Sequence, residues 1–275
     1  MIQLTDIKIY PIKSLAGISV ASASVEPKGL ALDRRWMLVD NQGRFLSQRK
    51  DPQMALLHLE WHTAAQEILR ISHRKKTLPP LLLPLEIKLS EERIKVSIWD
   101  DELMAIPLGQ GYDEWFSRAL DRNCRLVYMP SSDRRPVDPD YAQAEDSVSF
   151  ADGFPYLLAN HASLQDLNER LRTPITMDRF RANLIIEGTE AWAEDSWTSF
   201  KIGEVVFRSL KPCARCVLIT VDPATGEKSP EPLKTLSRFR KSGNKVLFGI
   251  NACWNLESGS ELKVGDQVEP KILGI

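Results

Sequence analysis

The sequence predicts a mainly β fold with a few helices, an α+β chain that forms two β-barrel-like domains. Short apolar runs separated by turns that contain Gly or Pro recur along most of the chain. Only two segments show the spacing of an amphipathic helix. With 275 residues, the chain has room for one large or two modest cores. We place the domain boundary near residue 120, which gives domains 1–120 and 121–275.

The N-terminal half is expected to consist mostly of strands. Apolar residues alternate with polar ones along Ile2–Ile9. Trp36–Val39 and Arg44–Ser47 flank Gly43 and predict a hairpin. A helix is expected over Tyr112–Leu120, whose apolar residues share one face. Further strands are expected at 56–61, 68–71, 86–89 and 93–99.

The C-terminal half is expected to hold a second helix and more short strands. Leucines recur at helical spacing from Ser163 to Leu171, and Ser163 with Asp166 suggests a capping pair at the start. The polar segment 131–149 is long for a loop, which indicates a functional loop or a flexible crossing. Strands are expected at 184–187, 201–207, 217–221 and 262–268, with turns at Gly203 and Gly265.

Composition narrows the function and the location. The formal net charge is -1, so the basic footprint of a nucleic-acid-coating protein is missing and no nucleic-acid partner is expected. No apolar run approaches the roughly 20 residues that span a bilayer, and the N-terminus lacks the layout of a signal peptide. Four cysteines without a secretory signal favour the cytoplasm, away from membranes.

The most informative residues are Cys213 and Cys216, which lie between Lys211 and a strand-like apolar run. A thiolate is a soft metal ligand and a strong nucleophile, and nearby Lys and Arg side chains favour it. We expect Cys216–Val221 to form a strand and 222–226 to form the turn that ends it. The pair should then lie at the mouth of a strand.

Spacing alone leaves several uses for this pair open. A structural zinc site needs four ligands, but Cys124 and Cys253 are isolated. A thioredoxin-like pair needs a helix that starts at the first cysteine, and a β-like run follows here instead. Two reduced thiols near a core, or one thiolate that ligates a metal cofactor, fit the pattern better.

Charged residues at expected strand ends suggest an anion-binding pocket, since Arg forks bind phosphate with two hydrogen bonds. Solvated surface charges are the plain alternative. Asp152 lies in a Gly-Pro loop, as a turn former or a site acid. His58 and His62 alternate along a strand and do not form the helical metalloprotease pair. The basic residues in question are Lys13, Arg34, Arg35, Arg49, Arg179, Arg181 and Arg215.

Several motifs together resemble the MOSC family. Tyr10–Ser14 and Gly29–Trp36 are similar to its N-terminal β-barrel domain. The MOSC domain proper is similar in the segments Phe150–Leu158, Phe180–Leu184, Ala193–Trp197, Lys211–Cys216, Pro232–Leu236, Phe248–Asn251 and Lys263–Asp266. The resemblance covers nearly the whole chain. Within the family it points to the mitochondrial amidoxime-reducing component and to bacterial proteins that reduce N-hydroxylated bases.

The resemblance implies a molybdenum cofactor (molybdopterin) in a cleft between the two domains. Cys216 would be the metal ligand, and Asp152 would lie near the metal as a catalytic residue that delivers a proton. Phe154 stands, before the proline of its loop, where the mitochondrial branch of the family tends to carry a small polar residue. Arg49, Arg134 and Arg135 are candidates for the cleft or for a donor-docking surface. Cofactor-binding residues would be Lys13, Ser14, Arg34, Gly153, Phe154, Arg181, Asn183, Arg215 and Asn251.

The activity implied by this resemblance is the reduction of N-hydroxylated small molecules. No cysteine follows Cys253, so the chain carries no four-cysteine iron–sulfur cluster in its last segment. Electrons are therefore expected from a separate flavoprotein or iron–sulfur protein. Two alternatives stay open. Cys216 could serve a molybdenum-cofactor or sulfur carrier module, or Cys213 and Cys216 could form a redox-active disulfide.

Overall fold

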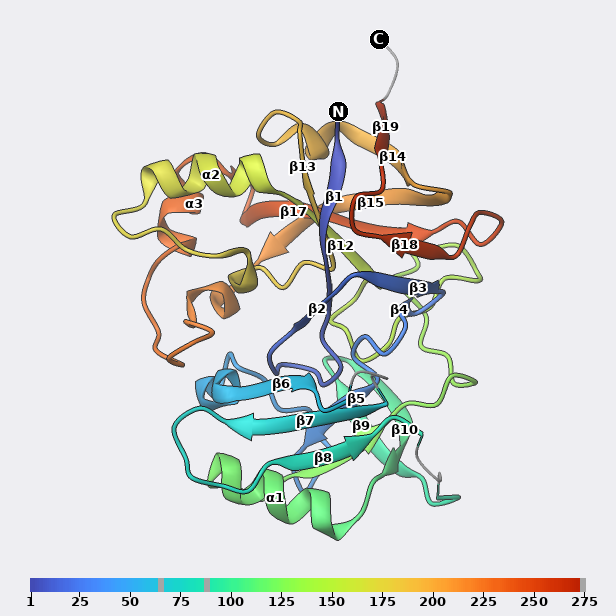
Figure 1. Ribbon diagram of the computed structural model, residues 1–275, viewed down its shortest axis with the longest axis vertical. Helices are drawn as coiled ribbons and strands as arrows, with labels where there is room; N and C mark the ends of the chain where they lie inside the picture. Colours follow the sequence, from blue (N-terminus) through green and yellow to red (C-terminus); the bar gives the residue numbers. More distant parts are fainter. Residues whose placement is uncertain (64–66, 87–89, 273–275) are drawn as a thin grey trace.

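The computed structural model describes residues 1–63, 67–86 and 90–272 and confirms a mainly β chain with few helices (Figure 1). The helices in the described residues are α1 (Gln110–Leu120), α2 (His161–Arg170) and α3 (Leu233–Phe239). Within those ranges, no helix is both long and apolar enough to cross a bilayer.

The largest sheet combines strands from both ends of the chain. Its strands are β1 (Gln3–Ile9), β2 (Ile18–Val20), β12 (Tyr156–Asn160), β13 (Leu184–Glu187), β14 (Trp197–Ile202), β15 (Val205–Arg215), β16 (Lys241–Ser242), β17 (Lys245–Trp254) and β19 (Val268–Ile272). The order is β19-β14-β15-β17-β12-β13-β1-β2, and β16 pairs with β17. β1 lies antiparallel to β13, so this sheet contains strands from either side of residue 120. The domain division there stays a prediction.

Three smaller sheets complete the described part of the chain. In Figure 1 two of them lie in the lower half with α1, and the third, built on β3, lies near the middle. The first consists of β5 (Trp36–Val39), β11 (Arg125–Tyr128), β10 (Asp101–Pro107) and β9 (Ile94–Ile98). The second consists of β18 (Glu261–Lys263), β3 (Ser22–Glu26) and β4 (Gly29–Leu30). The third consists of β6 (Leu57–Trp61), β7 (Ile68–His73) and β8 (Leu81–Pro84).

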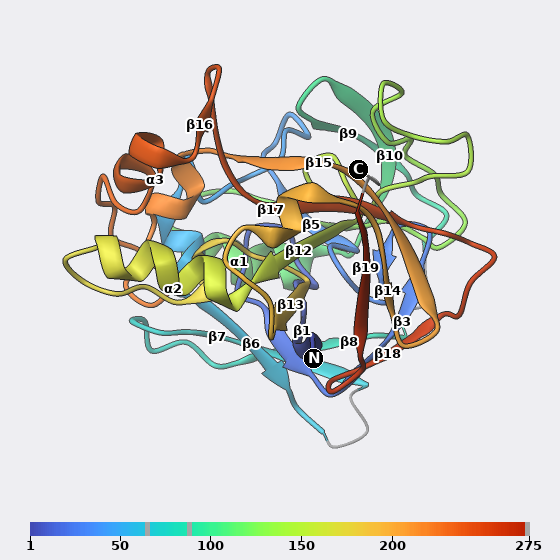
Figure 2. The same ribbon diagram turned by 90° about the horizontal axis from the view of Figure 1, so that it is seen from above.

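Buried apolar side chains hold these layers together. One cluster extends from Leu59 and Phe116 in the lower half to Ile186 and Phe207 in the large sheet. A second cluster packs α2 and α3, which lie on the same side of the molecule (Figure 2), against the sheet through Phe248. Because apolar side chains pack continuously between the halves, the loops that meet at their junction have fixed positions.

Both expected helices are confirmed, but the capping pair was wrong. α2 begins earlier, at His161, and the Oδ1 atom of Asn160 accepts a hydrogen bond from the backbone N–H of Ala162 at 3.0 Å. Asn160 has extended backbone and is therefore the cap. Ser163 instead lies within the helix, where its hydroxyl donates to Glu194 at 2.8 Å.

The strand expected at Cys216–Val221 was wrong. β15 contains Cys213 and ends at Arg215, just before Cys216, and Val217–Thr220 forms a single 3-10 turn. Ile219 is buried in the cluster around α2 and α3, whereas Val217 is exposed, so this short apolar run anchors a turn. The turn follows the strand and places Cys216 at its end.

Other expected strands differ in detail. The turns expected at Gly203 and Gly265 are confirmed: φ is positive at both, and they divide the segments 201–207 and 262–268 into β14 with β15 and β18 with β19. The second half of the expected 36–47 hairpin forms isolated bridges instead of a strand, between Phe45 and Val39 and between Arg44 and Ser97. Most of the strand expected at 86–89 falls at 87–89, outside the described residues.

Candidate functional site

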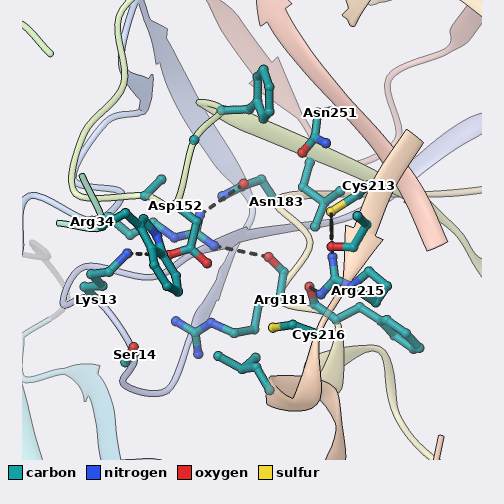
Figure 3. A pocket seen from close by; sticks show the side chains of 18 of the residues that line it. Lys13, Ser14, Arg34, Asp152, Arg181, Asn183, Cys213, Arg215, Cys216 and Asn251 are labelled. Atoms are coloured by element: carbon teal, nitrogen blue, oxygen red, sulfur yellow. Dashed lines mark hydrogen bonds and ion pairs between the residues drawn. The ribbon is translucent and has the colours of Figure 1, made fainter. Parts of the chain in front are cut away.

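All residues predicted for the site line one cavity of about 450 Å³ (Figure 3). The turn after β1 supplies Lys13 and Ser14, and the loop before β12 supplies Asp152, Gly153 and Phe154. Arg34 comes from the loop after β4, and Arg181 and Asn183 come from the segment before β13. Arg215 ends β15, Cys216 follows it directly, and Asn251 lies in β17. The structure thus brings them together, while the role of each stays a prediction.

Three of these residues have left-handed backbone conformations. The φ angles are 64° at Ser14, 49° at Arg34 and 56° at Arg181. This conformation costs a residue with a side chain about 1 kcal/mol or more. Backbone hydrogen bonds fix the turns, since Arg34 donates its N–H to the Tyr10 carbonyl at 2.8 Å and accepts from Phe150 at 2.9 Å. Strain held in place at a cavity wall is typical of a functional site.

Asp152 lies between two cations. Its Oδ1 atom is 2.6 Å from Lys13 Nζ, and its other oxygen accepts from Arg49. Burial alone would raise the pKa of Asp152, but Lys13 and Arg49 outweigh it and hold that pKa well below its usual range. Asp152 is therefore ionised at neutral pH, which argues against direct proton donation while both ion pairs are in place.

Lys13 is more acidic than an ordinary lysine. Its side chain is buried, and Nζ also donates to the Phe150 carbonyl at 2.7 Å. Burial lowers the pKa of Lys13 to about 8, although Asp152 opposes the shift. At neutral pH the ammonium form still predominates, and it holds a proton that a buried site can release more readily than an exposed lysine.

Asp152→Asn is expected to lower the free energy of unfolding by about 1–2 kcal/mol at pH 6–7. This cost is smaller than that of breaking a fully buried ion pair, because half of the Asp152 side chain is exposed to solvent. The folded pKa of Asp152 is depressed, so its contribution is complete above the ordinary value of 3.8 and declines as the pH falls below it. The difference between wild type and variant should therefore shrink between pH 4 and pH 2. Denaturant unfolding at several pH values measures it.

A matched control is Glu102→Gln, which removes an exposed ion pair with Lys95. That change should cost less than about 0.5 kcal/mol. An Asp152→Asn cost that is the same at pH 3 and pH 6 would contradict a depressed pKa for Asp152.

The two thiols of the pair have different arginine partners. Arg49 donates through Nε to Cys216 Sγ at 3.1 Å, and Cys216 is exposed at the cavity. Arg215 donates to Cys213 Sγ at 3.0 Å.

Burial raises the pKa of the other two thiols, to about 11 at Cys124 and about 12 at Cys253, so those thiols are inert. No cluster of three or more metal-binding side chains occurs in the described ranges, which gives no support to structural zinc.

A basic wall offers donors to an anion. Arg34 and Arg181 both lie over the Tyr10 ring, at 4.5 and 4.3 Å from its centre. Arg181 donates Nη1 to the Leu15 carbonyl at 2.6 Å, but its buried Nη2 has no partner among the described residues, and neither has Arg215 Nε. Burial and the nearby Arg34 lower the pKa of Arg181 to about 10, so it remains charged. Buried donors without partners fit an anionic group bound here.

The sequence matches two family descriptions in the order that the motifs suggest. Residues 1–123 match the MOSC N-terminal beta barrel domain, and residues 145–269 match the MOSC domain. The mitochondrial amidoxime-reducing component 1 of Mus musculus is 32% identical over 94% of this chain and 79% of its own length. The chain belongs to the MOSC family.

Two further relatives are similar to this MOSC protein over nearly its whole length. The Homo sapiens mitochondrial amidoxime-reducing component 1 is 32% identical over 94% of this chain and 80% of its own length. The molybdenum cofactor sulfurase of Oryza sativa subsp. japonica is 33% identical over 98% of this chain. The MOSC protein spans only 35% of that sulfurase, so the similarity concerns one part of a longer protein.

Some basic residues of the MOSC protein do not line the cavity. Arg35 donates to the Met129 carbonyl, and Arg179 pairs with Asp222 at 2.9 Å. Arg135, considered above for the cleft or a docking surface, is only 5% exposed and donates to main-chain carbonyls in 149–152. Arg134 binds the Ala144 carbonyl at 3.1 Å. His58 lies against Arg74 at 3.0 Å and its Nε2 atom is 3.9 Å from Glu60, but no group of three metal-binding side chains forms there among the described residues.

Nine lining residues were not among the predicted site residues, and those with a charged, thiol or indole side chain are Arg49, Trp99, Lys211 and Cys213. Lys211 and Cys213 lie beside Cys216 in the sequence, and that proximity is a usable signal. Arg49 was considered as one of many basic residues and as a candidate for the cleft or a docking surface, and it lines the cavity. Its contacts with Asp152 and Cys216 span more than 100 positions, which no local pattern encodes.

Proposed function

We propose that this MOSC protein is a molybdenum-cofactor oxidoreductase that reduces N-hydroxylated compounds with electrons from a separate donor protein. The observation that carries the proposal is the pairing, in one cavity, of an exposed thiol with buried arginine donors that lack partners. The soft sulfur suits a transition metal, and the arginines suit a phosphate. The relatives named as amidoxime-reducing components support the choice of reaction.

The chain's residues fit the parts of such a cofactor. Cys216 would supply a thiolate ligand to the metal. Arg34, Arg181 and Arg215 would hold the phosphate, and the amides of Asn183 and Asn251 lie in the same cavity to bind the pterin. When bound, the molybdenum centre supplies the two-electron redox chemistry of the reaction.

The reaction needs protons as well as electrons. Conversion of N–OH to N–H consumes two electrons and two protons and releases one water. Ionised Asp152 is poorly suited to donate directly, whereas Lys13 holds a proton 2.6 Å away. We therefore assign proton delivery to the Lys13–Asp152 pair as a unit. In this pair, the carboxylate fixes the position of the ammonium.

Molybdenum per chain, measured on full-length protein from a host that makes the cofactor, tests the cofactor assignment. Near-stoichiometric molybdenum together with reduction of hydroxylamines and amidoximes by a chemical or protein donor is the expected result. A chain without molybdenum from such a host would overturn the proposal. We expect a flavoprotein or an iron–sulfur protein as the donor and the cytoplasm as the location.

Arg181→Met is expected to lower molybdenum retention after gel filtration by at least about tenfold, because one buried charged donor contributes roughly 1.5–3 kcal/mol. Arg179→Met is the matched control, since Arg179 pairs with Asp222 and does not line this cavity. Elemental analysis of both variants measures the ratio. Equal retention would remove Arg181 from the phosphate site.

A second candidate function is a molybdenum-cofactor or sulfur carrier module that uses Cys216. The similarity to molybdenum cofactor sulfurases over nearly the whole chain favours it. Exposure of the Cys216 thiol also suits transfer to another protein. Tight molybdenum retention without any N-hydroxyl reductase activity, or a persulfide on Cys216 in intact-mass spectra, would favour the carrier. Activity with turnover would favour the reductase.

A further inference from the structure

Trp99 stands out as a large aromatic side chain that lines the cavity and remains 50% exposed. It lies at the tip of the β9–β10 hairpin, in the two-residue turn between Ile98 and Asp101. Tryptophan is enriched where proteins contact other molecules, because its large ring is apolar while its N–H can stay in water. The side chain belongs to the cavity that holds Cys216, but nothing in the proposed cofactor site uses it.

The backbone at Trp99 is unfavourable for this residue type. Its φ angle is 54°, in the left-handed region. Two-residue hairpin turns with positive φ at the first position favour glycine there, because a Cβ atom is crowded in that conformation. A bulky aromatic residue at such a position is an outlier that local folding does not require.

The ring is nevertheless held firmly in place. Phe45 packs on it with ring centres 5.0 Å apart at 60°, and the Arg49 guanidinium lies 4.5 Å from the ring centre. The same guanidinium contacts Asp152 and Cys216 Sγ. One arginine therefore links the ring to the acid and to the thiol.

The hairpin itself is tied to the Asp152 loop. Asp101, two residues after Trp99, accepts from Arg135 Nε at 2.7 Å. The other nitrogens of Arg135 donate to the carbonyls of Ala151 at 2.6 Å and Asp152 at 3.1 Å. Because Arg135 is buried, the distance between the aromatic ring and the Asp152 loop is fixed.

We propose that Trp99 forms the aromatic wall of the substrate subsite and selects flat, conjugated N-hydroxylated compounds over small aliphatic ones. The inference rests on the proposed function and specifies its substrate class. A conjugated ring gains from contact with an indole surface, whereas a small aliphatic hydroxylamine presents too little surface to do so. The strained backbone at Trp99 is then explained by binding.

The test compares benzamidoxime, a flat substrate, with N-methylhydroxylamine, a small aliphatic one, on full-length protein loaded with molybdenum. Trp99→Gly removes the ring and relieves the positive φ. It should lower kcat/KM for benzamidoxime at least about tenfold, mainly through KM, and change that for N-methylhydroxylamine less than about twofold. Trp99→Phe should recover most of the loss. Met104→Ala, an exposed position on the same hairpin outside the cavity, is the control.

Two further outcomes separate this inference from the proposed function. Trp99→Gly should keep or raise the denaturation midpoint. A lowered midpoint together with equal losses of kcat/KM for both substrates would mean that Trp99 has a structural role, and would overturn the inference. Unchanged kcat/KM for benzamidoxime in Trp99→Gly would also overturn it. If the wild type reduces neither compound, the proposed function fails. Calorimetric binding of benzamidoxime to the wild type and to Trp99→Gly then decides whether the subsite exists.

Discussion

Cys216→Ser is expected to lower the turnover of an N-hydroxylated substrate by at least about 100-fold, because a hard hydroxyl replaces the soft sulfur in a site for a transition metal. The fold should tolerate the change, with less than about 0.5 kcal/mol lost, since Cys216 is exposed and follows the end of β15. Molybdenum content, turnover and denaturant unfolding of the same preparation measure the three quantities.

The neighbouring thiol provides the control for that variant. Cys213 lies in β15 and accepts from Arg215, so Cys213→Ser should keep that hydrogen bond and reduce turnover by no more than about tenfold. A Cys216→Ser protein that carries molybdenum and works at the wild-type rate would remove the metal-ligand assignment. Equal, large losses in both variants would instead indicate that the two thiols act together, as in a disulfide.

The second large effect is expected on stability. Arg135→Met should lower the free energy of unfolding by about 3–5 kcal/mol, because it leaves an ion-pair partner and buried carbonyls unsatisfied. The groups concerned are the Asp101 carboxylate and the carbonyls of Ser149, Ala151 and Asp152. Arg135→Lys keeps the charge but cannot reproduce the guanidinium fork, so it should recover less than half of the loss.

Denaturant unfolding of these variants, with Arg134→Met beside them, tests this expectation. Arg134 is the adjacent residue and makes a single exposed hydrogen bond to Ala144, so its replacement should change stability by less than about 0.5 kcal/mol. Similar costs for Arg134→Met and Arg135→Met would show that the Asp152 loop does not depend on the buried guanidinium.

The parts of the fold that follow local rules were predictable from the sequence. Alternation and helical spacing predicted β1, β6, β7, α1 and α2, since each has one face toward the core. β17 was missed, because its residues from Phe248 to Cys253 are all buried and show no alternation. The apolar run after Cys216 was mistaken for a strand, since composition does not distinguish a buried turn from a short strand.

The site residues were predictable in identity through family motifs, and unpredictable in their contacts. Periodicity gave no reason to group Lys13 with Asp152, which lie 139 positions apart and form an ion pair. The same holds for Arg49 and Cys216. Trp99 was expected to end a strand over 93–99, and nothing in that pattern indicated a positive φ or a place on a cavity wall. These contacts depend on tertiary packing.

The pairing of β1 with β13 has a consequence for biosynthesis. Gln3 lies opposite Glu187, so β1 must wait for its partner until just over two thirds of the chain has been translated. At typical elongation rates that delay is on the order of ten seconds or more. During that time one edge of the nascent strand has no native partner and is open to chaperones or to unwanted association. Lys13 and Ser14 follow this strand directly, so the cavity is completed late in folding, and an N-terminal fragment made alone would lack its walls.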